Sequence, residues 1–146
     1  MQGLDIIYHE HRELVRLTEA VMAVASEPEL SIDRIAAARH ALGKVIVTHV
    51  LNKQALITAT LQASEDPEHR RLAWKFTQDL IKLRQSTTQH YGVWTMERIC
   101  KDPKGFHAGV SEQRRLLRLR IAWEEKEVFP IVARLLAASE PERRRA

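Results

Sequence analysis

The spacing of apolar residues constrains the fold of this chain more than any other feature. Apolar residues recur every three or four positions along nearly the whole sequence, and no stretch alternates apolar and polar residues as a strand does. Breaks that contain proline or glycine divide the pattern into four segments, residues 5–26, 31–63, 67–100 and 110–138. Long amphipathic helices with short connections predict an all-α fold, an antiparallel up-down-up-down four-helix bundle over residues 1–138. Residues 139–146 are predicted to form a solvated basic tail.

Local signals mark the ends of these segments. Ser31 is a suitable N-cap for the second helix, and Pro67 suits the first turn of the third. The stretch KDPKGFHAG, residues 101–109, is predicted to connect the third helix to the fourth. Pro130 lies inside the fourth segment, where it removes a backbone donor and is expected to kink the helix.

Composition limits the classes of protein to which the chain can belong. The 146 residues suffice for one domain, and 45% hydrophobic with 29% charged residues is a globular balance. No apolar run approaches the roughly 18 residues of a membrane span, and the start lacks the pattern of a secretory signal. Cys100 is the only cysteine, which excludes an internal disulfide and a CxxC metal site. These observations favour a cytoplasmic protein without a membrane partner.

Several polar residues lie on the apolar faces of the predicted helices. They are His11 on the first helix, His49 and Lys53 on the second, His69 on the third, and Arg120 and Glu124 on the fourth. Burying such groups is costly unless each finds a partner. A metal ion is one such partner, since helix bundles build metal sites from inward-facing side chains. The alternative is that each histidine is a core residue bonded to a carbonyl group or water.

The same residues lie in motifs that resemble a known family. The motifs are EHREL at 10–14, HVLNKQAL at 49–56, Glu68-His69, and WEEKEVFPIVARLL at 123–136. Together they resemble the hemerythrin-like, or HHE cation-binding, family over almost the whole chain. The resemblance implies a four-helix bundle that holds two non-haem irons between its helices and binds or senses oxygen, nitric oxide, peroxide or iron. The usual ligands are a histidine on the first helix, His-x-x-x-Glu on the second, a histidine on the third, and His-x-x-x-Glu on the fourth.

Two ligand positions of the family are occupied here by cations. His11, His49, His69 and Glu124 match the pattern as candidate or vestigial ligands, but Lys53 stands where the family has glutamate and Arg120 where it has histidine. Arginine and protonated lysine cannot coordinate a metal. Arg120 and Glu124, at i and i+4, can instead form an ion pair that Lys53 joins from the second helix. We expect this internal salt bridge to occupy the place of the di-iron centre, with Glu125 as a further candidate for the site and Glu127 solvated.

Three functions follow from these alternatives. The first is a regulatory or interaction module, in signalling for example, without cofactor or oxygen chemistry, with a protein partner or as a homodimer. The second is a metal-binding protein that holds one or two non-haem iron ions and senses or handles oxygen, nitric oxide or iron. The third is a nucleic-acid-associated helical protein that uses RRLLRLR, residues 114–120, although this run lacks interleaved aromatics. No phosphate loop or nucleophile pair indicates a hydrolase or transferase.

The remaining aromatic and histidine residues carry weaker expectations. Trp74, Trp94 and Trp123 are predicted to pack at helix boundaries, the alternative being exposed contacts with a partner. His107 is predicted to be solvated, and His90 to lie further along the row of His69.

Overall fold

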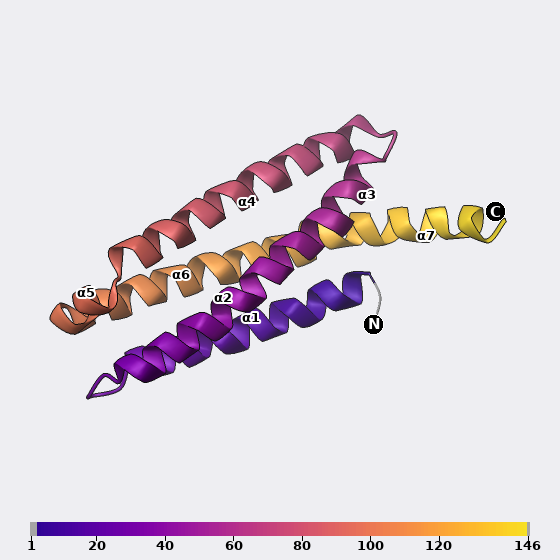
Figure 1. Ribbon diagram of the computed structural model, residues 1–146. Helices are drawn as coiled ribbons and strands as arrows, with labels where there is room; N and C mark the ends of the chain where they lie inside the picture. Colours follow the sequence, from indigo (N-terminus) through magenta and orange to yellow (C-terminus); the bar gives the residue numbers. More distant parts are fainter. Residues whose placement is uncertain (1–2, 146) are drawn as a thin grey trace.

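The computed structural model describes residues 3–145, and the side chains of residues 3–140, as helices with no strand among them (Figure 1). The helices are α1 (Leu4–Ala25), α2 (Ile32–Lys53), α3 (Ala59–Gln62), α4 (Pro67–Val93), α5 (Met96–Lys101), α6 (Pro103–Trp123) and α7 (Phe129–Arg145). Two π-helical turns, η1 (Gln54–Thr58) and η2 (Glu124–Val128), join α2 to α3 and α6 to α7 without a break. The predicted all-α class is therefore confirmed.

The long helices pack side by side. α1 packs against α2 and α6, while α4 packs against α6 and against α3. Figure 1 shows the chain reversing between α1 and α2, between α3 and α4, and through α5 between α4 and α6. In the described residues no helix is both long and apolar enough to cross a membrane.

Capping side chains explain where the helices begin. Ser31 Oγ accepts a hydrogen bond from the Arg34 amide at 3.3 Å, which confirms the predicted N-cap of α2. Asp66 caps α4 in the same way, and Pro67 occupies its first turn. The capping oxygen satisfies an amide that has no partner within the helix.

The third and fourth segments divide differently from the prediction. α4 ends at Val93, and Thr95 caps a separate short helix, α5. The predicted connection at residues 101–109 is wrong, because α6 already begins at Pro103. Asp102 caps it there, with Oδ1 accepting from the Gly105 amide at 3.0 Å. At the other end α7 continues to Arg145, past residue 138, where the predicted helix ended. The side chains of the basic tail beyond Glu140 lie outside the described residues.

Two apolar clusters form the core. One, near η1 and η2, is built around Ile57, Phe76 and Phe129, and the other, near α5, around Ile35 and Phe106. All five side chains are fully buried or nearly so.

Candidate functional site: a buried ionic centre

Four charged or titratable side chains meet where α2 and α6 pass into their π-helical turns. His11 lies in the middle of α1, Lys53 is the last residue of α2, Arg120 lies in the last turn of α6, and Glu124 opens η2. Glu124 is completely buried, Lys53 is 3% exposed, and the side chain of Arg120 is 9% exposed. We call these four residues the ionic centre.

Glu124 is bonded on three sides. Its Oε2 accepts hydrogen bonds from Lys53 Nζ at 2.6 Å and from Arg120 Nε at 2.5 Å. Its Oε1 lies 3.1 Å from Nε2 of His11. The predicted pair between Arg120 and Glu124 is present, and Lys53 joins it from α2, so both cations point inward instead of extending to solvent.

The charges around Glu124 keep it ionised despite its burial. Burial alone raises the pKa of this carboxyl, but the hydrogen bond from His11 and the charges of Lys53 and Arg120 outweigh it. The pKa of Glu124 is lowered from 4.5 to about 2. Burial acts in the opposite sense on Lys53, whose pKa is lowered although Glu124 opposes the shift.

A second polar pair lies next to the ionic centre. His49 Nδ1 lies 2.9 Å from Glu10 Oε1, and Asn52 Nδ2 donates to Glu10 Oε2 at 2.6 Å. Burial, followed by the charge of Lys53, lowers the pKa of His49 to about 3, so the ring is neutral at pH 7 and its Nδ1–H donates to Glu10. Our sequence interpretation missed Glu10 and Asn52 as site residues. Glu10 had a signal, because it lies four residues before Leu14 on the apolar face of α1.

The ring of His11 lies between Glu124 of the ionic centre and the neighbouring His49. It stacks on Phe129 with centroids 5.3 Å apart and meets the His49 ring edge-on at 5.0 Å. Its Nδ1 is buried without a hydrogen-bond partner among the described side chains, and Glu125 Oε1 lies 3.4 Å away. Glu125, the further candidate from the sequence, therefore borders the site.

α4 contributes an aromatic face and a carboxylate to the ionic centre instead of a histidine. The ring centroid of Phe76 lies 5.4 Å from Lys53 Nζ and 4.7 Å from Arg120 Cζ, and Arg120 also donates to the Phe76 carbonyl at 3.2 Å. Asp79 Oδ2 lies 3.7 Å from Arg120 Nη1. Aromatic faces stabilise cations that have lost part of their hydration.

The structure does not bring His69 to the ionic centre. Its Nδ1 lies 2.8 Å from Ser64 Oγ, and its Nε2 lies 3.7 Å from Asp66, at the start of α4. Its assignment as a candidate ligand is therefore corrected. Helical spacing predicts the face of a helix on which a side chain lies, but not its level along the molecule, and His69 lies at the start of α4 instead of beside Glu124. His90, further along that row, stacks near Phe106.

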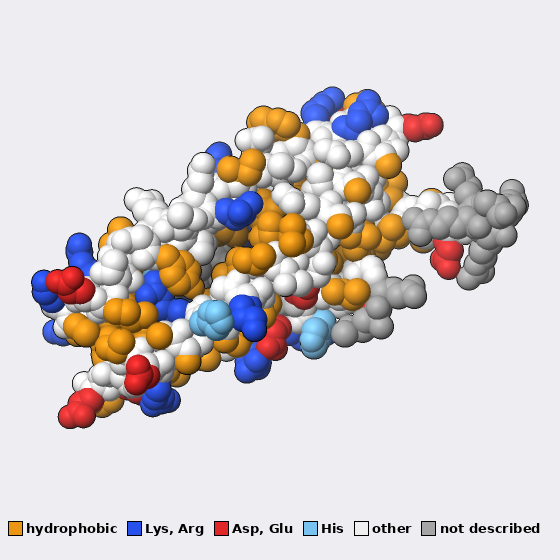
Figure 2. Space-filling model, viewed as in Figure 1, with side chains coloured by type: hydrophobic (Ala, Val, Ile, Leu, Met, Phe, Trp, Pro, Cys, Tyr) orange, Lys and Arg blue, Asp and Glu red, His pale blue; other side chains and the backbone are white. Residues whose placement is uncertain are grey.

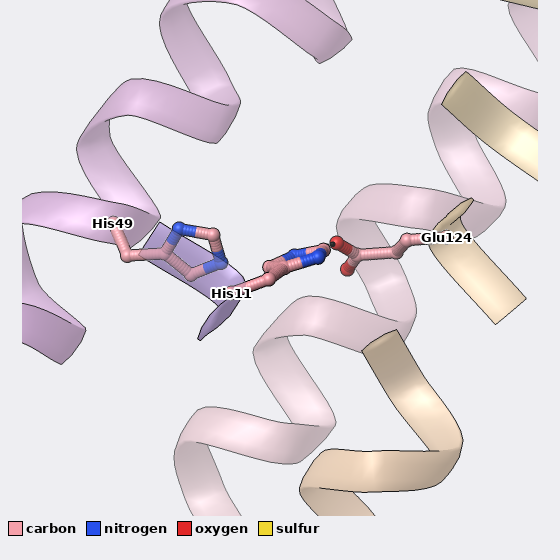
Figure 3. A group of neighbouring side chains, drawn as sticks. All are labelled: His11, His49 and Glu124. Carbon is pink, nitrogen blue, oxygen red and sulfur yellow. Dashed lines mark hydrogen bonds and ion pairs between the residues drawn. The ribbon is translucent and has the colours of Figure 1, made fainter. Parts of the chain in front are cut away.

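His11 and Glu124 of the ionic centre lie close enough to the neighbouring His49 for the three side chains to share one metal ion. Figure 3 shows the side chains of His49, His11 and Glu124 in a row from three different segments, and one ligand atom from each lies within 4.8 Å of the others. The residues do not fit the two irons that the resemblance implies. Both oxygens of Glu124 are already bonded, and two cations stand against Oε2, where they would repel a divalent ion.

The basic run RRLLRLR forms ion pairs within the molecule. Arg114 and Arg118 both contact Glu19, at 2.6 and 2.7 Å, and Arg115 contacts Glu112 at 2.6 Å. Arg120 belongs to the ionic centre. These arginines are therefore matched by carboxylates instead of forming an unpaired cationic stripe.

The three tryptophans differ in environment. Trp74 on α4 is 68% exposed, contrary to the expected boundary position, whereas Trp94 and Trp123 are half-buried as predicted. Trp123 stacks on Phe76 and covers Arg120, with its centroid 4.7 Å from Arg120 Cζ.

No protein-family model, curated protein or solved structure matches this chain. The geometry of the ionic centre therefore carries the functional proposal.

Proposed function

We propose that this chain is a hemerythrin-like four-helix bundle that works without metal, as a regulatory or interaction module. The observation that carries the proposal is the pair of cations, Lys53 and Arg120, bonded to one oxygen of Glu124. In the family that the motifs resemble, the corresponding positions supply metal ligands. Here Lys53 and Arg120 are bonded to Glu124 Oε2, and their positive charges oppose the approach of a metal cation to that oxygen.

A buried ionic centre of this kind contributes to folding specificity, and a protein partner would be recognised by surface residues. Exposed apolar side chains offer such a surface on two helices: Val47 and Leu51 on α2 are 63% and 60% exposed, and Trp74 on α4 is 68% exposed. Large exposed apolar groups are typical of contacts with a protein partner or a second copy of the chain.

The proposal is tested by restoring the donors of the family. The double variant Lys53→Glu/Arg120→His replaces both cations with potential ligands, and Lys53→Met/Arg120→Met is the matched control, which removes the cations without adding donors. Calorimetric titration with Fe²⁺ and with Zn²⁺ is expected to show metal binding in the Lys53→Glu/Arg120→His variant and none in the Met/Met control. Circular dichroism verifies that each variant is folded. Tight binding of either ion by the unmodified chain would overturn the proposal.

A second function has a specific observation in its favour. His11, His49 and Glu124 lie close enough to hold a single ion, in line with a metal-binding protein that senses or handles oxygen, nitric oxide or iron. Such an ion would lie close to Lys53 and Arg120, whose positive charges oppose its binding. The nucleic-acid alternative is less favoured, because the arginines of residues 114–120 are paired with carboxylates. Binding to DNA or RNA that falls steeply with salt would support it.

A further inference from the structure

A cavity of about 320 Å³ lies between α1, α2, α4 and α6. Figure 2 shows hydrophobic side chains gathered around a hollow in the face between α2 and α4. Most of its lining is apolar, including Leu14, Ile46, Leu80 and Leu117. Sites for small molecules have volumes of about 300–1,000 Å³ and mainly apolar walls with a few polar groups, so this cavity lies at the lower end of that range.

The charged groups that line the cavity are all basic. They are Arg39, Lys53, Arg84 and Arg120, and the described lining contains no aspartate or glutamate. At one end, Lys53 and Arg120 are both paired with Glu124, and Asp79 lies 3.7 Å from Arg120 as a second carboxylate. Arg84 is exposed to solvent, where hydration stabilises its charge. Arg39, on α2, is the buried member of the group whose charge has no such compensation.

Arg39 is 8% exposed and has no carboxylate within 4.0 Å among residues 3–140. Its Nη1 donates to the Trp94 carbonyl at 2.9 Å, and its side chain also has a hydrogen bond with Tyr91, so its neighbours supply neutral acceptors but no counter-charge. Its Cζ lies 4.3 Å from the ring centroid of Tyr91 and 5.7 Å from that of Phe106. Burial lowers the pKa of Arg39, but an arginine stays charged in proteins. A buried cation without a counter-charge is costly, and an anion bound beside it would remove that cost.

The neighbours of Arg39 add polarity to this end of the cavity without adding charge. Burial, and then the charge of Arg39, lowers the pKa of His90 to about 4, so its ring is neutral at pH 7. Tyr91 and Gln113 also line the cavity and offer further hydrogen-bonding groups. The single positive charge of Arg39 is best balanced by a ligand that carries a single negative charge. A carboxylate accepts the guanidinium in a bidentate pair and carries that single charge, whereas a phosphate monoester carries more.

We propose that this cavity binds a medium-chain fatty acid or a similar elongated apolar monocarboxylate. The carboxylate pairs with Arg39, and the chain lies along the apolar lining toward Lys53 and Arg120. The limited volume favours a medium chain over a long one. The proposal does not require the ionic centre to bind a metal or to lack one, because the carboxylate is held by Arg39, which is not part of that centre.

Titration calorimetry with decanoate tests this site, with decanol as the neutral molecule of equal chain length. Decanoate is expected to bind the unmodified protein at one site and more tightly than decanol. The variant Arg39→Gln is expected to weaken decanoate binding about ten-fold or more and to leave decanol binding unchanged, because only the charged head contacts Arg39. The matched control Arg84→Gln removes an exposed arginine from the same cavity and is expected to have little effect.

A second variant locates the ligand even if Arg39→Gln proves unstable. A Cβ added at Gly43, which lines the cavity, meets nothing within 4 Å, so Gly43→Leu fills part of the cavity and keeps every charge. It is expected to abolish decanoate binding. The proposal is overturned if decanoate does not bind, if decanol binds equally well, or if Gly43→Leu binds decanoate like the unmodified protein.

Discussion

Glu124 is the residue on which the electrostatics of the ionic centre depends. Its carboxylate contacts Lys53 and Arg120 at once and faces His11 through its other oxygen. A buried ion pair of this kind adds little net stability compared with an apolar replacement, since desolvation offsets the attraction. Removing one partner is different, because the remaining charge stays buried without compensation.

Glu124→Gln is therefore expected to lower the free energy of unfolding by about 3–5 kcal/mol, because two buried cations lose their counter-charge. Urea denaturation followed by circular dichroism measures the change. Glu127→Gln, at an exposed position of the same π-helical turn, is the matched control and is expected to stay within about 0.5 kcal/mol of the unmodified chain. Equal effects of the two substitutions would contradict the central position of Glu124.

Buried histidines make the stability depend on pH. The pKa of His49 is lowered to about 3 and that of His90 to about 4, both chiefly by burial, from an ordinary value of 6.5. Below pH 6.5 these histidines become protonated in the unfolded chain, whereas in the folded chain they stay neutral until the pH approaches their lowered pKa values. The free energy of unfolding therefore falls as the pH falls, by about 1.4 kcal/mol per pH unit for each histidine. Glu124, with a pKa lowered to about 2, adds a loss in the same direction below about pH 4.5.

Urea midpoints measured between pH 7 and pH 4 are accordingly expected to fall steadily. His90→Gln removes one of the groups and is expected to make the dependence shallower, whereas His9→Gln, at an exposed position, is expected to leave it unchanged. A stability that is constant or rises toward pH 4 would contradict this assignment of neutral buried histidines.

At the scale of helices, both α2 and α6 change from α-helical to π-helical geometry beside the ionic centre. η1 follows directly after Lys53, and η2 begins at Glu124. Single π-helical turns within longer helices are frequent at functional sites. Pro130 lies two residues after η2, and the carbonyl four residues before it, with which a proline ring clashes in a regular α-helix, is that of Lys126 within this turn. A kink was predicted at Pro130, and the structure has a π-helical turn directly before this part of the helix. No proline follows η1, so its π-helical turn could not be predicted from a local signal.

Glycines in two helices are expected to respond oppositely to alanine. At Gly43 in α2 a new Cβ meets nothing within 4 Å, so Gly43→Ala should raise the free energy of unfolding by about 0.4–1 kcal/mol through lower entropy of the unfolded chain. At Gly109 in α6 the same atom would lie 2.8 Å from Trp94 Nε1 and 3.2 Å from His90 Cε1. Gly109→Ala should therefore be destabilising. Thermal unfolding measures both, and a Gly109→Ala variant as stable as Gly43→Ala would refute the close packing of Trp94.

The start of a helix could be predicted where its cap is a single clear signal. Ser31 and Pro67 marked the starts of α2 and α4 correctly. The stretch around Asp102 and Pro103 was interpreted as a loop because it is rich in proline and glycine. The same two residues also form a cap and a first turn, and packing of Phe106 into the core favours the helix.

At the scale of the whole molecule, helical spacing predicted which side chains face inward but not which of them meet. Lys53, Arg120 and Glu124 were correctly expected to form an internal salt bridge, since two of them share one helix at i and i+4. His69 was assigned to the same centre because spacing fixes a face and not a level along the molecule. That level depends on how the connection at residues 63–66 positions α4, a property of packing that no local pattern contains.

Whether the ionic centre needs a metal ion is the central question about this molecule. The centre adjoins the cluster around Phe76 and Phe129, and an apolar cavity extends from it toward Arg39. A centre satisfied by its own side chains leaves the molecule folded without an ion. A centre built to hold iron would instead lose stability when the ion is removed.

The most direct test is elemental analysis, with an ultraviolet-visible spectrum, of protein expressed in iron-supplemented medium and purified without chelator or histidine tag. If Lys53 and Arg120 occupy the place of the metal ligands, the protein will contain far less than one metal per chain and will show no charge-transfer band. It will also unfold at the same temperature with and without a chelator. Stoichiometric iron at two per chain, with an oxo-bridge charge-transfer band, would contradict the account.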